Sequence, residues 1–133
     1  MRCLLDTHAL IWALSEAKKL PKNVRSMVED PENEIFVSAA SAWEIAIKSA
    51  LGKIEFPLVD LGRAAAAAGL VELPVCLRHA VAVRDLPMHH RDPFDRILVV
   101  QALQENLYLV THDPVLASYG VRTMWGEPGK RSR

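Results

Sequence analysis

The chain has 133 residues, which is enough for one compact domain with a single core and too few for two domains of ordinary size. Half of its residues are hydrophobic and 24% are charged, a composition typical of a globular protein and not of a disordered one. Lys and Arg number 16, as do Asp and Glu, so the overall charge gives no case for nucleic-acid binding, which must depend on local groups.

The two cysteines, Cys3 and Cys76, lie in apolar surroundings, where free buried thiols are expected. Their number and spacing indicate neither a disulfide scaffold nor a zinc site. The apolar N-terminal segment contains Asp6 and His8, which argues against a secretory signal, and no apolar stretch reaches the length of a membrane span. We therefore expect a cytoplasmic protein.

The N-terminal part of the chain alternates short apolar runs with helical patterns, which is typical of a parallel sheet covered by helices. Residues 2–5 predict a buried strand, and residues 8–15 predict the helix that follows it. A second helix is expected over residues 22–29, before a turn-rich segment. The β-branched and aromatic residues within 34–39 predict the second strand.

A helix is expected from residue 41 to residue 51, with Gly52 as its C-terminal stop. Its apolar positions include Trp43, Ile47 and Ala50, which recur at helical spacing. This spacing predicts that Trp43, like Trp12 in the first helix, packs into the core instead of offering a surface on which RNA bases stack.

The second half of the chain continues the alternation of helices and strands. An alanine-rich helix is expected over 63–68, a third strand over 70–74, and another helix near 77–84. The clearest helix begins after Asp92, a good N-cap, with Pro93 at the first helical position.

A buried strand is predicted within residues 107–113, and a last strand within 121–125. We expect residues 1–125 to form a single domain and residues 126–133 to form a flexible basic tail. The predicted fold class is therefore α/β, with helices on a central parallel sheet.

Four acids stand where strands end or helices begin: Asp6, Glu44, Asp95 and Asp113. In open parallel sheets, sites form beside the carboxyl ends of the strands, where helices also begin, so these four side chains can converge. Carboxylates drawn together repel one another unless cations lie between them. Oxygen ligands suit Mg²⁺ or Mn²⁺, and such ions support hydrolysis of phosphodiester bonds.

Two of these acids also have a purely structural explanation. Ser41 and Glu44 match the S-x-x-E capping box, in which the glutamate satisfies backbone donors at a helix start. Asp113 precedes Pro114, a common pair at turns. Taken singly, Glu44 is explained equally well by either role, and Asp113 is explained better by the turn.

Asp92 and Asp95 lie three residues apart in a first helical turn, where carboxylates favour the positive end of the helix dipole. Asp92 fits the role of helix cap better than that of a metal ligand. Asp6 is the hardest acid to explain structurally, because a carboxylate that follows a buried apolar strand is partly desolvated and needs a partner.

Several histidines lie beside these acids in the sequence. They are His8, His89, His90 and His112. None has the spacing of a zinc motif such as H-E-x-x-H, so we interpret them as surface residues or as neighbours of the ligands.

Four motifs in this order resemble those of the PIN-domain ribonucleases, and in particular the VapC-type toxins of bacterial toxin–antitoxin pairs. The motifs are LLDTHALIWAL (4–14), SAWEIAIKSALGKIEFP (41–57), HHRDPFDRILVVQA (89–102) and LVTHD (109–113). The resemblance implies a three-layer α/β/α fold with a central parallel sheet and Mg²⁺- or Mn²⁺-dependent endonucleolytic cleavage of RNA. It also implies a homodimer and a cognate antitoxin that enters the active-site groove, often with a basic side chain.

In this resemblance, the four acids take the roles of catalytic residues and metal ligands in chain order: Asp6, Glu44, Asp95 and Asp113. Three residues take auxiliary roles beside them: Thr7, Asp92 and Thr111.

RNA must be held by local positive charge. The candidates near the motifs are Lys48, Lys53, Arg91 and Arg96. Lys48 lies one helical turn after Glu44, so an ion pair with Glu44 explains it as well as RNA binding does. Arg96 is explained equally by a plain surface role.

Two other functions compete with RNA cleavage. The chain can be a regulatory binding module whose acidic pocket receives a partner's arginine, without turnover. It can also be a phosphotransfer domain or phosphatase with Asp6 as its nucleophile. Against the latter, His8 stands where that chemistry needs a second acid.

Overall fold

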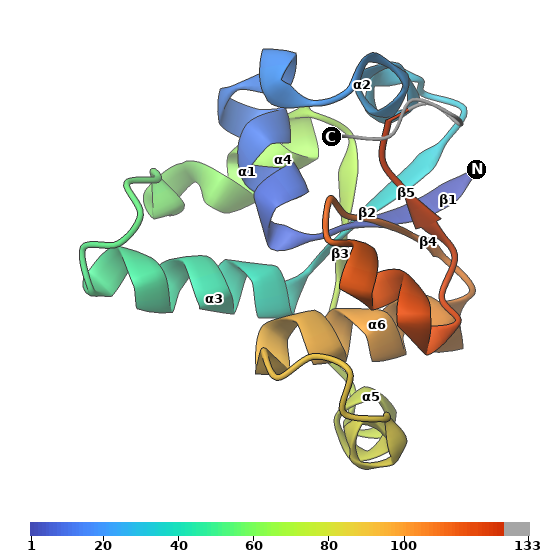
Figure 1. Ribbon diagram of the computed structural model, residues 1–133. Coiled ribbons are helices and arrows are strands. Elements are labelled where there is room, and N and C mark those ends of the chain that lie inside the picture. The colour runs from blue at the N-terminus through green and yellow to red at the C-terminus, as the bar shows by residue number, and fades with distance from the viewer. Residues whose placement is uncertain (127–133) are drawn as a thin grey trace.

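A sheet of five parallel strands forms the centre of the computed structural model, which describes residues 1–126 (Figure 1). In spatial order the strands are β3 (Leu70–Leu73), β2 (Glu34–Ser38), β1 (Arg2–Leu5), β4 (Tyr108–Val110) and β5 (Thr123–Met124). Because every neighbouring pair is parallel, all the carboxyl ends lie along one edge of the sheet. The segments that follow β1 and β4 are therefore neighbours at this edge.

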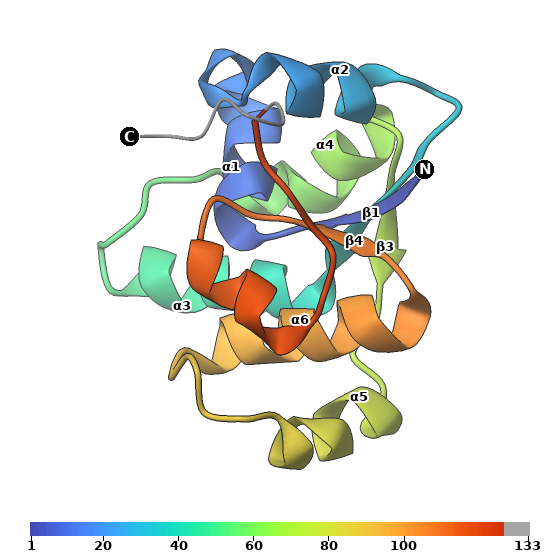
Figure 2. The ribbon, with the colours of Figure 1, turned by 45° about the vertical axis from the view of Figure 1, so that its right-hand side comes forward.

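Helices cover both faces of the sheet, which confirms the expected three-layer α/β/α architecture (Figure 1). The α-helices are α1 (Thr7–Ser15), α2 (Lys22–Glu29), α3 (Ala39–Ala50), α4 (Leu61–Ala67), α5 (Leu77–Ala82) and α6 (Pro93–Glu105). Short 3-10 helices are η1 (Ala17–Lys19), η2 (Leu58–Asp60), η3 (Val83–Asp85) and η4 (Pro114–Tyr119). Helices α1, α2 and α4 lie on one face and α6 on the other, while α5 packs on the outer side of α6 (Figure 2).

The alternation of side chains along β1 divides the core into two layers. Cys3 and Leu5 belong to the cluster beneath α1 and α2, whereas Leu4 belongs to the cluster with α6 and η4. All three side chains are fully buried, as expected for a central strand covered on both faces. The strand that leads to Asp6 is thereby fixed from both sides.

Most elements fall where the sequence predicts them, because the signals that start and end them are local. Asp92 caps α6 by accepting hydrogen bonds from the backbone N–H groups of Phe94 and Asp95, and Pro93 is the first helical residue. The helix expected near 77–84 is shorter and continues as η3. Cys76 is partly exposed, not buried as expected.

Two further expectations concern the chain as a whole. Among residues 1–126, no helix has the length and apolar character to cross a bilayer. The tail predicted over 126–133 lies outside the described residues apart from Gly126.

Helix α3 differs from its prediction in both its start and its buried face. It begins at Ala39, with the hydroxyl of Ser38 accepting from the N–H of Ala40 at 3.0 Å, so the alternative explanation of Glu44 as part of a capping box with Ser41 is wrong. Trp43 is 63% exposed and Ile47 38% exposed, and the expectation that this stripe packs into the core is also wrong. The periodicity identifies an apolar stripe but not which face the rest of the fold covers.

The buried face of α3 instead carries Ser41, Glu44 and Ile45. This helix contacts both α1 and α6, so its buried face packs between those two helices. A polar buried face is unusual for a helix, because each polar group needs a partner there.

Arg96 is buried, which corrects the expectation that it binds RNA at the surface. Its guanidinium donates to the carbonyl oxygens of Val83, Leu86, Pro87 and His90 and to the hydroxyl of Tyr119. These bonds hold the loop between η3 and α6 against the body of the protein. A guanidinium has five N–H donors in one plane, compared with three on an ammonium, so it can satisfy several carbonyls that lie around it.

We predict that Arg96→Met lowers the free energy of unfolding by about 2 kcal/mol or more, because it leaves several carbonyl groups without donors. Urea denaturation followed by circular dichroism measures this change. Arg91→Met is the matched control, since Arg91 is exposed in the same loop and its change should stay within about 0.5 kcal/mol. Equal stability of the two variants would show that Arg96 does not anchor the loop.

Candidate metal centre

Asp6 lies at the carboxyl end of the central strand β1, and it is only 7% exposed. Its backbone N–H donates to the carbonyl of Val110, and its side chain caps α1 by accepting from the N–H of Ala9 at 2.8 Å. A hydrogen bond from the Thr111 side chain also reaches its carboxylate. Burial nevertheless raises the pKa of Asp6, so these partners do not fully replace the lost water.

Glu44 projects from the buried face of α3 and is 5% exposed. One carboxylate oxygen accepts from the hydroxyl of Thr7 at 2.5 Å, and the other meets the ammonium of Lys48 at 2.6 Å. Thr7 follows Asp6 directly, so this contact ties α3 to the end of β1. The hydrogen bond with Glu44 raises the pKa of Lys48, which keeps its positive charge.

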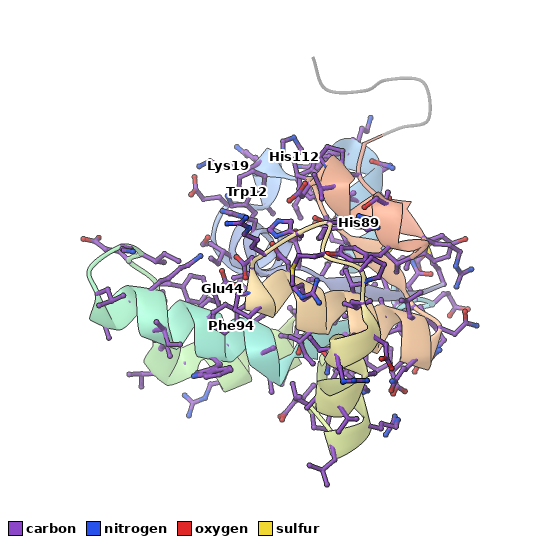
Figure 3. The ribbon with its side chains drawn as sticks, turned by 60° about the horizontal axis from the view of Figure 1, so that its bottom comes forward. Trp12, Lys19, Glu44, His89, Phe94 and His112 are labelled. Carbon is purple, nitrogen blue, oxygen red and sulfur yellow. The ribbon has the colours of Figure 1, made fainter. Side chains whose placement is uncertain are left out.

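Asp95 lies in the first turn of α6, next to Phe94, whose ring is 5.2 Å from that of Trp43 in α3. Figure 3 shows Phe94 of α6 close to Glu44 of α3. Burial, followed by the charge of Asp92, raises the pKa of Asp95 to about 7. The charges of Asp6 and Glu44 act in the same direction, which means that these acids are close enough to repel one another.

Asp113 follows strand β4 and has two separate contacts. One oxygen caps η4 by accepting from the N–H of Val115 at 2.9 Å, as the turn interpretation predicts. The other lies 3.1 Å from Nε2 of His90. The N–H of Asp113 donates to the Thr111 hydroxyl at 3.1 Å, so Thr111 connects Asp113 with Asp6.

The structure thus brings the four predicted acids to one end of the molecule, and the side chains of Thr7 and Thr111 contact them. Asp92 is the cap of α6 and adds negative charge beside Asp95. Lys48 pairs with Glu44 but keeps a side chain that is 38% exposed. Arg91 is exposed in the loop before α6, with no contact to the acids described.

His90 is the residue of this site that sequence reasoning undervalued. Its Nε2 lies 3.3 Å from Asp95 and 3.1 Å from Asp113. These three residues form a group whose potential ligand atoms all lie within 4.8 Å of one another. A signal for its role was present in the sequence. His90 lies two residues before the helix cap Asp92, and a cap fixes the position of the loop next to it.

The site fits a hard divalent cation. Its carboxylate oxygens come from two strand ends and two helices, and Lys48 is the cation in direct contact with Glu44. Burial first, and neighbouring acids after it, raise the pKa values of Asp6 and Asp95, so negative charge on these carboxylates is unfavourable unless a cation lies beside them. Oxygen donors with such excess charge are what Mg²⁺ and Mn²⁺ bind.

Comparisons with known proteins agree with the architecture. A sequence model of the PIN domain matches residues 3–121. No curated protein sequence matches the chain.

Three solved structures of similar fold are those of VapBC2 from Rickettsia felis bound to a fragment of its promoter DNA, FitAB bound to an IR36 DNA fragment, and FitAcB from Neisseria gonorrhoeae. The first has a TM-score of 0.67 at 15% identity and covers 94% of this chain and 99% of its own. FitAB has a TM-score of 0.61 at 17% identity, with coverages of 93% and 94%. FitAcB has a TM-score of 0.61 at 19% identity, with coverages of 93% and 96%.

We predict that, without divalent cations, the protein loses stability as the pH rises from about 4 to about 7. The pKa of Asp95 is raised from 3.8 to about 7, so the folded state binds its proton more tightly than the unfolded chain does. This contribution is complete below pH 4 and is lost as the pH passes through 7. Urea denaturation in EDTA across this range measures it.

Asp95→Asn should flatten that pH dependence and be more stable than the wild type at pH 8. Asp85→Asn is the control, because Asp85 carries an exposed carboxylate outside the site. A wild-type profile that rises between pH 4 and pH 7 and is unchanged by Asp95→Asn would contradict the assignment of Asp95.

Proposed function

Since the chain belongs to the PIN domain family, we propose that it is a metal-dependent endoribonuclease and the toxin of a toxin–antitoxin pair. The observation that carries this proposal is the convergence of Asp6, Glu44 and Asp95 with Asp113 at the carboxyl edge of the sheet. Carboxylates that repel one another in a partly buried site are stabilised by a divalent cation.

Each acid has a defined part in such a site. A bound Mg²⁺ or Mn²⁺ activates a water molecule and stabilises the charge that develops on a phosphodiester. Asp6, Asp95 and Asp113 are the carboxylates that hold the ion, with Glu44 completing the set. Thr7 orients Glu44 by its 2.5 Å hydrogen bond, and the cap at Asp92 fixes the turn that carries Asp95.

Because the chain has no net charge, RNA binding requires basic side chains near the acids. Lys48 and Arg91 fit this role. The side chain of Lys48 is partly exposed beside Glu44, and Arg91 is exposed in the loop before α6. Arg96 is excluded from it by its burial. RNA is therefore expected to bind through a few local contacts and to dissociate readily as the salt concentration rises.

The partners follow from the resemblance to the VapC-type toxins and from one surface of this chain. A cognate antitoxin is the expected inhibitor, and the fold shared with VapBC2 supports that assignment. The exposed stripe of α3, made of Trp43, Ile47 and Leu51, supports a homodimer, because large apolar side chains repeating along one helix face are typical of an interface.

We predict that Asp6→Asn lowers the rate of RNA cleavage by about a hundredfold or more, because the ion loses a ligand. Purified protein with Mg²⁺ or Mn²⁺ and structured RNA should give cuts that EDTA abolishes. Asp85→Asn, which changes an exposed acid outside the site, should cleave as the wild type does.

Cleavage that survives Asp6→Asn or EDTA would contradict the proposed nuclease. Tight binding of a partner's arginine without any turnover would instead favour the regulatory binding module. Trapping of an acyl-phosphate on Asp6 would favour phosphotransfer.

For the homodimer, we predict that Ile47→Asp combined with Leu51→Asp yields a monomer, because burying two carboxylates in an apolar interface is unfavourable. Light scattering coupled to size-exclusion chromatography measures the molar mass. Val59→Asp is the control, since Val59 is 97% exposed in η2 and does not belong to the stripe of α3. A wild-type monomer, or a double variant that remains dimeric, would contradict this interface.

A further inference from the structure

A histidine ring stands between two of the site acids. Nε2 of His90 lies 3.1 Å from Oδ2 of Asp113 and 3.3 Å from Oδ2 of Asp95. The ring is therefore hydrogen-bonded to one carboxylate that follows β4, and a second carboxylate from the first turn of α6 lies beside the same nitrogen.

The other ring nitrogen of His90 determines which nitrogen carries the proton. The backbone N–H of Asp92 donates to Nδ1 of His90 at 3.0 Å. A backbone N–H can only donate, so Nδ1 presents its lone pair, and the single proton of the neutral ring is on Nε2. Nε2 is then a donor to Asp113, with the carboxylate of Asp95 beside it, and has no lone pair to offer a metal ion.

The backbone of His90 is held in place by the loop anchored at Arg96. Its N–H donates to the hydroxyl of Tyr119 at 2.8 Å, and its carbonyl accepts from the guanidinium of Arg96 at 3.3 Å. With the backbone fixed on both sides, rotation of the side chain is the simplest motion that moves the ring away from the acids. The adjacent His89 is exposed and lies against the ring of Tyr119 instead.

We propose that His90 competes with the divalent cation for the position between Asp95 and Asp113, and that its ring must rotate away before the ion binds there. This inference rests on the proposed metal-dependent function. A Mg²⁺ ion needs to approach each carboxylate oxygen to about 2.1 Å, in the space to which Nε2–H points. The hydrogen bonds of His90 therefore have to break first, which lowers the apparent affinity for metal.

The opposite role, in which His90 is a metal ligand, conflicts with the hydrogen bond from Asp92. If Nε2 binds the metal, the ring proton must be on Nδ1. Two hydrogen-bond donors, Nδ1–H and the N–H of Asp92, then point at each other, which is unfavourable. That N–H belongs to the cap of α6, so it cannot turn away without disturbing the helix start. If His90 competes with the ion, removing its ring raises the affinity for metal. If His90 is a ligand, removing its ring lowers that affinity.

The test is the affinity of the full-length protein for Mn²⁺, measured from the electron paramagnetic resonance signal of the free ion. His90→Ala should bind Mn²⁺ about tenfold more tightly than the wild type, because no hydrogen bonds to charged groups have to break. His89→Ala is the matched control, one residue away, and its affinity should stay within about twofold of the wild type. Thermal melting checks that each variant is folded.

A second measurement follows the ring itself. Titration with diamagnetic Mg²⁺ should shift the ring resonances of His90 in ¹H–¹³C spectra and leave those of His89 in place. His90 resonances that stay unchanged at saturating Mg²⁺ would overturn the proposal.

Equal or weaker Mn²⁺ binding by His90→Ala would also overturn it, and weaker binding would identify His90 as a ligand. If the wild type binds Mn²⁺ and cleaves RNA in these cases, only the role of His90 fails. If neither protein binds Mn²⁺, the proposed metal-dependent function fails with it.

Discussion

Repulsion among carboxylates at the carboxyl edge of a parallel sheet is the constraint on which the rest of this structure depends. Strand β1 is buried on both faces, so Asp6 at its end has little water to stabilise its charge. The edge geometry places Asp113 at the end of the neighbouring strand, and helices α3 and α6 bring Glu44 and Asp95 to the same place. A cluster of this kind persists in a folded protein only if cations or hydrogen-bond donors compensate it.

The protein supplies part of this compensation from its own residues. Thr7 and Thr111 donate hydroxyl hydrogen bonds to Glu44 and Asp6, and Lys48 places a charge against Glu44. The pKa of Asp95 remains raised to about 7, so the compensation is incomplete without a further cation. In the proposed function, the same carboxylates that lower stability give the site its affinity for a divalent cation.

The sequence predicts the fold well because its signals are local. Alternation of apolar runs and helical patterns gives the strand and helix order, and the pair of Asp92 and Pro93 locates the start of α6. Sequence-based prediction fails where the orientation or burial of a residue depends on tertiary packing. The apolar stripe through Trp43 does not reveal that α3 turns its polar side inward. The position of Arg96 next to Asp95 does not reveal that Arg96 is buried among loop carbonyls. The convergence of four acids was predictable from topology, whereas the place of His90 between two of them depends on one hydrogen bond to a helix cap.

The central claim is that the four acids share a divalent cation, and anomalous diffraction from crystals containing Mn²⁺ tests it most directly. The account predicts an anomalous peak about 2.1 Å from carboxylate oxygens of Asp6, Asp95 and Asp113, with the ring of His90 rotated away. It is contradicted if crystals saturated with Mn²⁺ show no peak at these acids, and the carboxylates are paired with protein groups alone.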